Sequence, residues 1–147
     1  MILISHRGNI NGPNPEMEND PRYVENTLAR GYNVEVDVWS NGSDFFLGHD
    51  KPEHQVSELF LRHGSIWCHA KNIETFYKLI KAGVHCFSHD QDEVALTTKG
   101  YLWSTYENQM TDKSICVMPP RNTELPKNIV GVCSDYVEDY KWNHINT

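Results

Sequence analysis

Short apolar segments recur along the whole chain, and polar stretches separate them. Eight of these segments have the length expected of buried β-strands: Ile2–Ile4, Val34–Val38, Phe45–Leu47, Ile66–Cys68, Val84–Phe87, Tyr101–Trp103, Ile115–Met118 and Ile129–Cys133. Helical patterns lie between several of them, and a strand–helix–strand order implies parallel pairing of the strands. The pattern therefore predicts an α/β fold built on a parallel sheet.

The clearest helical pattern covers residues 73–82. Four apolar side chains recur there with helical spacing on one face: Ile73, Phe76, Tyr77 and Ile80. Asn72 can cap the start of this helix, and Gly83 can end it. Weaker helical patterns occupy Val24–Arg30 and Val56–Arg62.

Polar residues suited to chemistry follow the C-terminal ends of the predicted strands: His6, Arg7, Asp37, His49, His69, Lys71, His89, Trp103 and Asp135. In a parallel barrel these strand ends converge on one face, where barrel enzymes build their active sites. We therefore expect a minimal (β/α)8 barrel of the TIM type that spans residues 1–147 as a single domain. The tail from Tyr136 to Thr147 is then a final amphipathic helix that closes the barrel.

The length of the chain limits such a barrel. A TIM barrel typically takes about 250 residues, and this chain has 147, so several helices must be shortened or missing. The connection V-W-S-N-G-S-D between Asp37 and Phe45 has hairpin composition and is shorter than the dozen or so residues of a parallel crossover. Strands without helical cover must bury apolar surface elsewhere, and a homo-oligomer could supply that burial.

The composition narrows the function classes. Hydrophobic residues make up 39% of the chain and charged residues 22%, which is typical of a globular protein. The net charge of -7 disfavours binding to nucleic acid or to an anionic membrane surface. No apolar run approaches the roughly 20 residues of a membrane span, and no basic and apolar leader opens the chain, so we expect neither a membrane span nor secretion. Four unpaired cysteines in apolar stretches indicate buried free thiols and a cytoplasmic location.

Two carboxylates alternate with valines in the second apolar segment. On a strand, Glu35 and Asp37 share one face while the valines of Val34–Val38 pack on the other. Like charges at this spacing repel unless a cation lies between them, and Mg²⁺ or Ca²⁺ suits carboxylate oxygens best. The alternative is that E-V-D forms only the solvated face of a half-exposed strand.

A second group of candidates follows the first strand. His6 and Arg7 open a long loop rich in Gly, Asn and Pro, which is a common form of binding element. Arg7 offers a planar fork for phosphate oxygens, and His6 can exchange protons near neutral pH. His49 ends a later strand and could be the second proton carrier. For each histidine alone, a hydrogen-bonded structural role is the competing interpretation.

Four short motifs together resemble the glycerophosphodiester phosphodiesterase family, one of the phospholipase-C-like phosphodiesterase barrels: H-R-G at 6–8, E-N-T at 25–27, E-V-D at 35–37 and G-H-D at 48–50. Their order and spacing agree with the family. Further on, S-I-W-C-H-A-K is similar to the family's fourth strand, which normally ends E-x-K, and V-G-V-C-S-D is similar to its last strand. The resemblance is strong over residues 2–50, partial to residue 71 and thin between 84 and 128.

The resemblance implies roles for the matching residues. His6 and His49 would be the acid–base pair, and Arg7 would contact the phosphate. Glu35 and Asp37 would bind a divalent cation. The chain would then be a metal-dependent phosphodiesterase that hydrolyses glycerophosphodiester-like small molecules. The alternative is a catalytically weak barrel that binds a sugar- or glycerol-phosphate without turnover.

Other positions are less closely defined by the resemblance. Glu25 of E-N-T would support the metal region, with a polar residue of the first helix as the competing interpretation, and Lys71 would stabilise phosphoryl charge. His69 stands where the family has a metal-binding Glu: as a ligand its nitrogen favours Mn²⁺ over Ca²⁺, whereas off the metal it would bind the phosphate. His89 and Trp103 are candidate substrate contacts, and their competing interpretations are a polar loop start and a core tryptophan.

Overall fold

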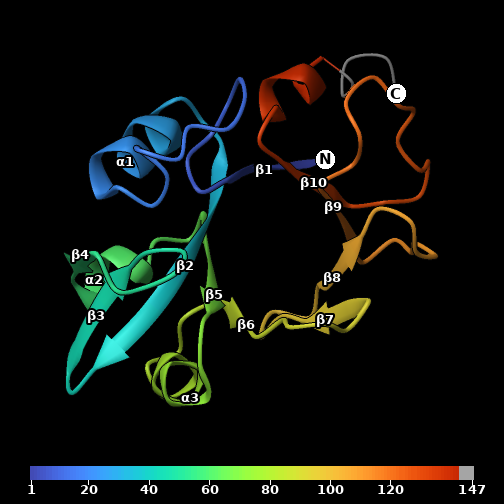
Figure 1. Ribbon diagram of the computed structural model, residues 1–147. Helices are drawn as coiled ribbons and strands as arrows, with labels where there is room; N and C mark the ends of the chain where they lie inside the picture. The colour runs from blue at the N-terminus through green and yellow to red at the C-terminus, as the bar shows by residue number, and fades with distance from the viewer. Residues whose placement is uncertain (143–147) are drawn as a thin grey trace.

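The computed structural model describes residues 1–142, which form one mixed sheet of ten strands, three α-helices and one 3₁₀-helix (Figure 1). The strands are β1 (Ile2–His6), β2 (Asn33–Asn41), β3 (Asp44–Leu47), β4 (His54–Val56), β5 (Ile66–Ala70), β6 (Cys86–Phe87), β7 (Val94–Leu96), β8 (Leu102–Thr105), β9 (Ser114–Val117) and β10 (Gly131–Ser134). The helices are α1 (Pro21–Ala29), α2 (Glu58–Leu61), α3 (Ile73–Lys81) and the 3₁₀-helix η1 (Val137–Tyr140). The end of the predicted tail helix, residues 143–147, lies outside the described residues.

Most of the sheet is parallel. The strands β6, β5, β2, β1, β10, β9 and β8 pair in this order, and every pairing between them is parallel. Three strands run antiparallel to their neighbours: β3 on β2, β4 on β3, and β7 on β8. The first and last strands of the chain, β1 and β10, are therefore direct neighbours in the middle of the sheet.

The predicted (β/α)8 barrel is wrong, because the sheet is mixed and open and carries only three α-helices over residues 1–142. The short connection after Asp37 makes an antiparallel hairpin, β2–β3, as its composition indicated. The sheet curls so that β6 and β7 lie near each other (Figure 1), and the Thr98 amide donates to the Cys86 carbonyl, but over the described range no strand ladder joins them. A chain of this length lacks the residues for eight helical crossovers.

Local capping explains where the helices begin. The Asp20 side chain accepts from the Arg22 amide, and Pro21 occupies the first turn of α1, where a missing N–H costs nothing. The predicted cap of α3 is confirmed, since the Asn72 side chain accepts from the Thr75 amide. Gly83 ends the same helix at a φ of 72°, a left-handed conformation that glycine adopts without strain.

The two faces of the sheet carry separate hydrophobic clusters. On the outer face, the valines of β2 pack against α1, α2 and α3 together with side chains from β3 and β5. On the inner face, aromatic side chains dominate: Trp67, Phe87 and Trp103 lie with Ile4, Ala95, Ile115 and Cys133. All four cysteines are buried and free, as predicted. None of the described helices has both the length and the apolar character needed to cross a bilayer.

Candidate metal centre

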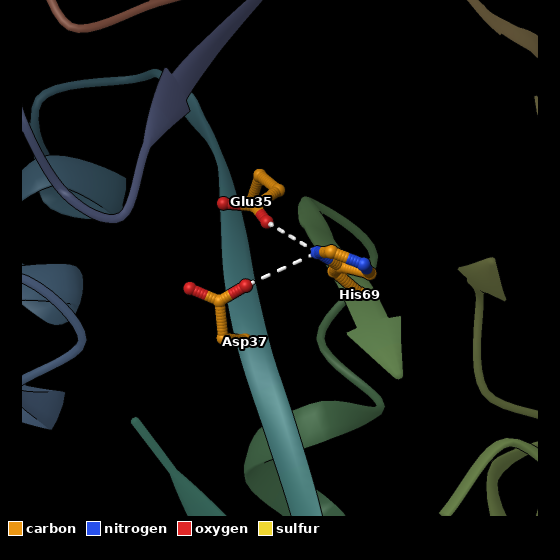
Figure 2. A group of neighbouring side chains, drawn as sticks. All are labelled: Glu35, Asp37 and His69. Carbon is orange, nitrogen blue, oxygen red and sulfur yellow. Dashed lines mark hydrogen bonds and ion pairs between the residues drawn. The ribbon is translucent and has the colours of Figure 1, made fainter. Parts of the chain in front are cut away.

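Three side chains of neighbouring parallel strands form a compact buried group. Glu35 and Asp37 project from β2 and His69 from β5, where Asp37 and His69 are register partners. His69 Nδ1 lies 3.1 Å from Asp37 Oδ1 and 3.7 Å from Glu35 Oε2 (Figure 2). One donor atom from each of the three residues lies within 4.8 Å of the others, so the group could hold a metal ion. Both carboxylates are buried, so E-V-D is not a solvated strand face.

The donor set fits a cation. His69 Nε2 lies 3.1 Å from the His89 carbonyl, which can only accept, so Nε2 carries a proton. In the neutral imidazole, the Nδ1 lone pair then points at two carboxylates, an arrangement that requires a cation or a second proton between them. Over residues 1–142, the buried Glu35 Oε1 also has no hydrogen-bond partner. Adjacent ligands of an octahedral ion are about 3 Å apart, which is close to the His69–Asp37 separation.

The two carboxyl groups differ in acidity. Burial, together with the nearby Asp37, raises the pKa of Glu35 to about 7. Burial alone would also raise the pKa of Asp37, but the His69 hydrogen bond and the Arg7 guanidinium hold it below its usual range. The pKa of His69 is raised, because Asp37 and Glu35 outweigh its own burial. Negative charge is therefore concentrated on Asp37, next to the nitrogen of His69.

Asp37 is held in place from several directions. The Asn19 side chain donates to Asp37 Oδ2 at 2.9 Å, and its oxygen accepts from the Asp37 amide at 2.9 Å. Arg7 Nε lies 3.0 Å from Asp37 Oδ2 as an ion pair, and Lys71 Nζ lies 3.9 Å from Oδ1. Arg7 Nη1 also donates to Glu18 at 3.3 Å. Two cationic side chains, Arg7 and Lys71, therefore lie within 4 Å of the Asp37 carboxylate.

His6 belongs to a second buried chain of hydrogen bonds. Its Nδ1 lies 2.8 Å from Asp135 Oδ1, which also accepts from Asn9 at 2.8 Å, while Tyr23 donates to Asn9 at 2.9 Å. Burial would lower the pKa of His6, but Asp135 and Glu35 raise it. Because Nδ1–H donates to a carboxylate, Nε2 is the free nitrogen, and it lies 3.9 Å from Glu35 Oε1. His6 thus presents a proton-accepting atom to the carboxylate group.

The structure brings together six of the predicted site residues: His6, Arg7, Glu35, Asp37, His69 and Lys71. His49 is apart from them. Its side chain is 48% exposed and lies 2.8 Å from Asp50, although the preceding Gly48 amide donates to the Asp37 carbonyl at 3.2 Å. His49 therefore follows the same edge of the sheet, but over the described residues it has no ion pair or hydrogen bond with the group.

Glu25 is exposed on α1 and is not part of the group that could hold a metal ion. The dipeptide Glu-Asn occurs three times, and the structure places the first copy, Glu18-Asn19, at the site. Sequence analysis missed this pair. Asp20-Pro21 is a helix-start signal, and it could have shown that Glu25 lies one turn inside α1, away from the loop that follows Arg7.

The two remaining candidates, His89 and Trp103, differ in whether they contact the metal-binding group. His89 contributes its carbonyl to His69, and its buried Nδ1 has no partner in the described part of the chain. Trp103 is buried on the inner face, where its ring stacks on Phe87 with centroids 4.5 Å apart. Trp103 is thus a core tryptophan beneath the site, as its competing interpretation held.

Searches against protein-family models, curated proteins and solved structures found no match to this chain. The likeness of its motifs to the phosphodiesterase family therefore stays a prediction. The chemistry of the side chains at the strand ends is the basis on which a function can be proposed.

Proposed function

We propose that this protein is a divalent-cation-dependent phosphodiesterase acting on small glycerophosphodiester-like substrates. The observation that carries the proposal is the buried group of Glu35, Asp37 and His69 with His6 and Arg7 directly beside it. A buried cluster of two carboxylates and an imidazole, flanked by a proton acceptor and a guanidinium, matches the needs of phosphoryl chemistry.

Glu35, Asp37 and His69 would hold the cation. A bound divalent ion supplies charge neutralisation for the phosphoryl oxygens of a diester. With one imidazole in place of a third carboxylate, the donor set is less negative and includes nitrogen, which weakens Ca²⁺ binding and favours Mn²⁺. We therefore expect Mn²⁺ to support activity at least as well as Mg²⁺ or Ca²⁺, and His69→Glu to shift the preference back toward Ca²⁺.

His6 is the proton carrier that the geometry supports best. Asp135 fixes its ring through Nδ1, and Asn9 and Tyr23 fix Asp135 in turn, so Nε2 faces the carboxylate group. In this orientation His6 can take a proton from a water or from a substrate hydroxyl. Asp135 is a positioning residue, because it acts only through the imidazole.

Arg7 and Lys71 are suited to the phosphate. Both cations lie within 4 Å of Asp37, one of the residues that would hold the ion. Their side chains are mostly buried, so their charges are weakly screened and act strongly on a nearby anion. They would stabilise the added negative charge of the transition state.

A second candidate function is binding of a phosphate ester without turnover. The observation that favours it is the position of His49, whose exposed ring is paired with Asp50. If His49 does not reach the leaving oxygen, the site keeps its cation and phosphate groups but lacks a second proton carrier. Such a protein would bind glycerol phosphate in the presence of a divalent cation and would not cleave diesters.

Metal-stimulated hydrolysis of bis(p-nitrophenyl) phosphate, and of a glycerophosphodiester, tests the proposal. We expect a rate that rises with added Mn²⁺ or Mg²⁺, is lost in chelator, and falls roughly 10²-fold or more in Asp37→Asn. Glu58→Gln, an exposed carboxylate of α2, is the matched control and should retain the wild-type rate. Calorimetric titration with Mn²⁺ separates the two candidates, because binding without hydrolysis favours the second and absence of metal binding contradicts both.

A further inference from the structure

Helix α3 turns part of its apolar surface away from the sheet. Thr75 and Leu79 are its buried residues, whereas Ile73, Tyr77 and Ile80 are exposed. These three lie at positions i, i+4 and i+7, so they form one continuous stripe along the helix. The sheet does not cover these three, whereas Phe76, the fourth residue of the predicted face, packs partly buried against the outer cluster.

A second exposed apolar pair lies on β7, where Val94 and Leu96 are exposed while Ala95 belongs to the inner cluster. On α3, Lys78 Nζ donates to the Gly42 carbonyl, so a polar side of the helix faces the β2–β3 hairpin. Figure 1 shows α3 and β7 on either side of the two-residue strand β6, and over residues 1–142 no helix lies outside β7.

We propose that this surface is a homodimer interface in which α3 packs antiparallel to α3 of a second copy. The α3–β7 face comprises Ile73, Tyr77, Ile80, Val94 and Leu96, which are between 47% and 85% exposed. An exposed apolar stripe such as that of α3 marks an interaction surface, unlike apolar residues that are exposed singly. A two-fold dimer requires that the face be complementary to itself.

The charges of α3 meet this requirement. Glu74 lies in the first turn of the helix, where it pairs with Lys78 at 2.8 Å, and Lys81 lies in the last turn beside Tyr77, with Nζ 5.7 Å from the ring centroid. Because an exposed i,i+4 pair of this kind is weak, the Glu74 carboxylate can also pair with a lysine of a second copy. In an antiparallel pair with the two-fold axis near Tyr77, Glu74 of each copy faces Lys81 of the other. Ile73 of each copy then faces Ile80 of the other, and the two helix dipoles run in opposite directions, which is favourable.

The same charges favour an antiparallel over a parallel second copy. A parallel neighbour would place Glu74 against an acidic first turn and Lys81 against a basic last turn, which is unfavourable. A stable dimer covers roughly 800 Å² on each partner, so the flanking charges must belong to the interface along with the apolar stripe. No residue of the α3–β7 face belongs to the Glu35, Asp37 and His69 group, so the inference does not depend on the proposed function.

Sedimentation equilibrium of the full chain tests the interface. We expect the wild type to show twice the monomer mass of 17.0 kDa and Tyr77→Glu to show the monomer mass. Leu59→Glu is the matched control, because Leu59 is 80% exposed on α2 and lies outside the face, so this variant should remain dimeric. Circular dichroism checks that each variant is folded, and Leu96→Glu replaces Tyr77→Glu if the latter unfolds. A monomeric wild type, or a monomeric Leu59→Glu variant, overturns the proposal.

A charge exchange tests the antiparallel orientation. Glu74→Lys converts two attractive contacts of the dimer into two repulsive ones, so the dissociation constant should rise roughly tenfold. Lys81→Glu should have the same effect. The double variant Glu74→Lys/Lys81→Glu restores both contacts with reversed sign and should return the constant to near the wild-type value. If the double variant is weaker than either single one, the antiparallel pairing is wrong.

Discussion

Burial controls the chemistry of single side chains in this protein. Glu35 and Asp37 are two residues apart on one strand, yet burial raises the pKa of Glu35 while His69 and Arg7 lower the pKa of Asp37. His6 and His69 both have a raised pKa because each contacts a buried carboxylate. The residue types alone do not set these properties, because partners from distant parts of the chain determine them.

His6→Ala and His49→Ala test the proton carriers of the proposed phosphodiesterase. Each substitution should lower turnover by roughly 10²-fold or more, since loss of a general acid or base typically does so. Binding of Mn²⁺ should survive in both variants, because neither histidine belongs to the group that could hold the ion. Steady-state kinetics with a chromogenic diester gives the rates. Two variants that hydrolyse the diester at the wild-type rate would show that the two-histidine mechanism is wrong.

His85, far from the site, makes stability depend on pH. Burial, with a smaller effect from Lys99, lowers the pKa of His85 to about 4. Below pH 6.5 this histidine binds a proton in the unfolded chain but stays neutral in the folded protein. The free energy of unfolding is therefore unaffected by His85 above pH 6.5 and decreases as the pH falls toward 4. Each unit of pKa difference corresponds to about 1.4 kcal/mol, and after solvent screening the loss in free energy of unfolding at acidic pH is roughly 2 kcal/mol.

Urea unfolding of wild type and His85→Gln from pH 4 to pH 8 measures this effect. Glutamine does not titrate and can still hydrogen-bond to Thr97, the partner of His85. The difference in free energy of unfolding between the two proteins should be constant above pH 7 and should change in favour of the variant on acidification. A difference independent of pH would contradict the assigned pKa.

At the scale of elements, the loop between β1 and α1 organises the site. Asn19 closes this loop over the strand ends: it makes two hydrogen bonds to Asp37, and its amide donates to the Arg7 carbonyl. Its φ of 66° is left-handed, which asparagine tolerates better than most residues. One side chain thus connects the loop to a strand eighteen positions away.

Asn19→Ala should therefore destabilise the fold and weaken metal binding together. The substitution removes two buried hydrogen bonds and leaves alanine in a left-handed backbone conformation, which together should lower the free energy of unfolding by about 3 kcal/mol. In Asn19→Gly the backbone is free of strain and only the side-chain hydrogen bonds are lost, so the free energy of unfolding should fall by less. Asn26→Ala, in the second Glu-Asn pair, is the control, because Asn26 is exposed on α1, and it should stay within about 0.5 kcal/mol of wild type. Urea unfolding and Mn²⁺ titration give both quantities, and equal effects of Asn19→Ala and Asn26→Ala would refute the role of the loop.

At the scale of the whole molecule, the pairing of β1 with β10 brings His6 to Asp135. His6 ends β1, and Asp135 directly follows β10, which lies beside β1 in the sheet. The contact between the histidine and the carboxylate therefore joins segments near the two ends of the chain. Gly131 makes the close approach possible. A Cβ at this position would lie 2.8 Å from the Ile2 carbonyl oxygen and 2.8 Å from Ile115 Cδ1.

Gly131→Ala should separate β10 from its neighbours. The clash involves backbone, which cannot rotate away, so we expect a loss of about 2 kcal/mol or more in the free energy of unfolding. Gly64→Ala is the control, since a Cβ there meets nothing within 4 Å. Thermal unfolding should separate the two variants clearly. A Gly131→Ala protein as stable as Gly64→Ala would show that the strands can move apart without cost.

The sequence by itself determined the local features of this protein. Alternation of valines with Glu35 and Asp37 predicted two carboxylates on one face, and the burial of both valines and carboxylates agrees with that pattern. The caps of α3 were readable from Asn72 and Gly83 because capping involves only a few adjacent residues. The gathering of His6, Asp37 and His69 was predictable as well, because parallel neighbours place their C-terminal ends at one edge whether or not a sheet closes.

Tertiary structure alone decided the rest. Whether the strands close into a barrel depends on whether β6 and β7 pair, and the curled open sheet arises from pairings between segments far apart in sequence. The dipeptide Glu-Asn by itself does not distinguish Glu18-Asn19 from Glu25-Asn26, and the fold of the loop brings the first of them to Asp37. The exposure of Ile73, Tyr77 and Ile80 on α3 could not be predicted either, because helical spacing shows that apolar residues share a face but not what covers that face.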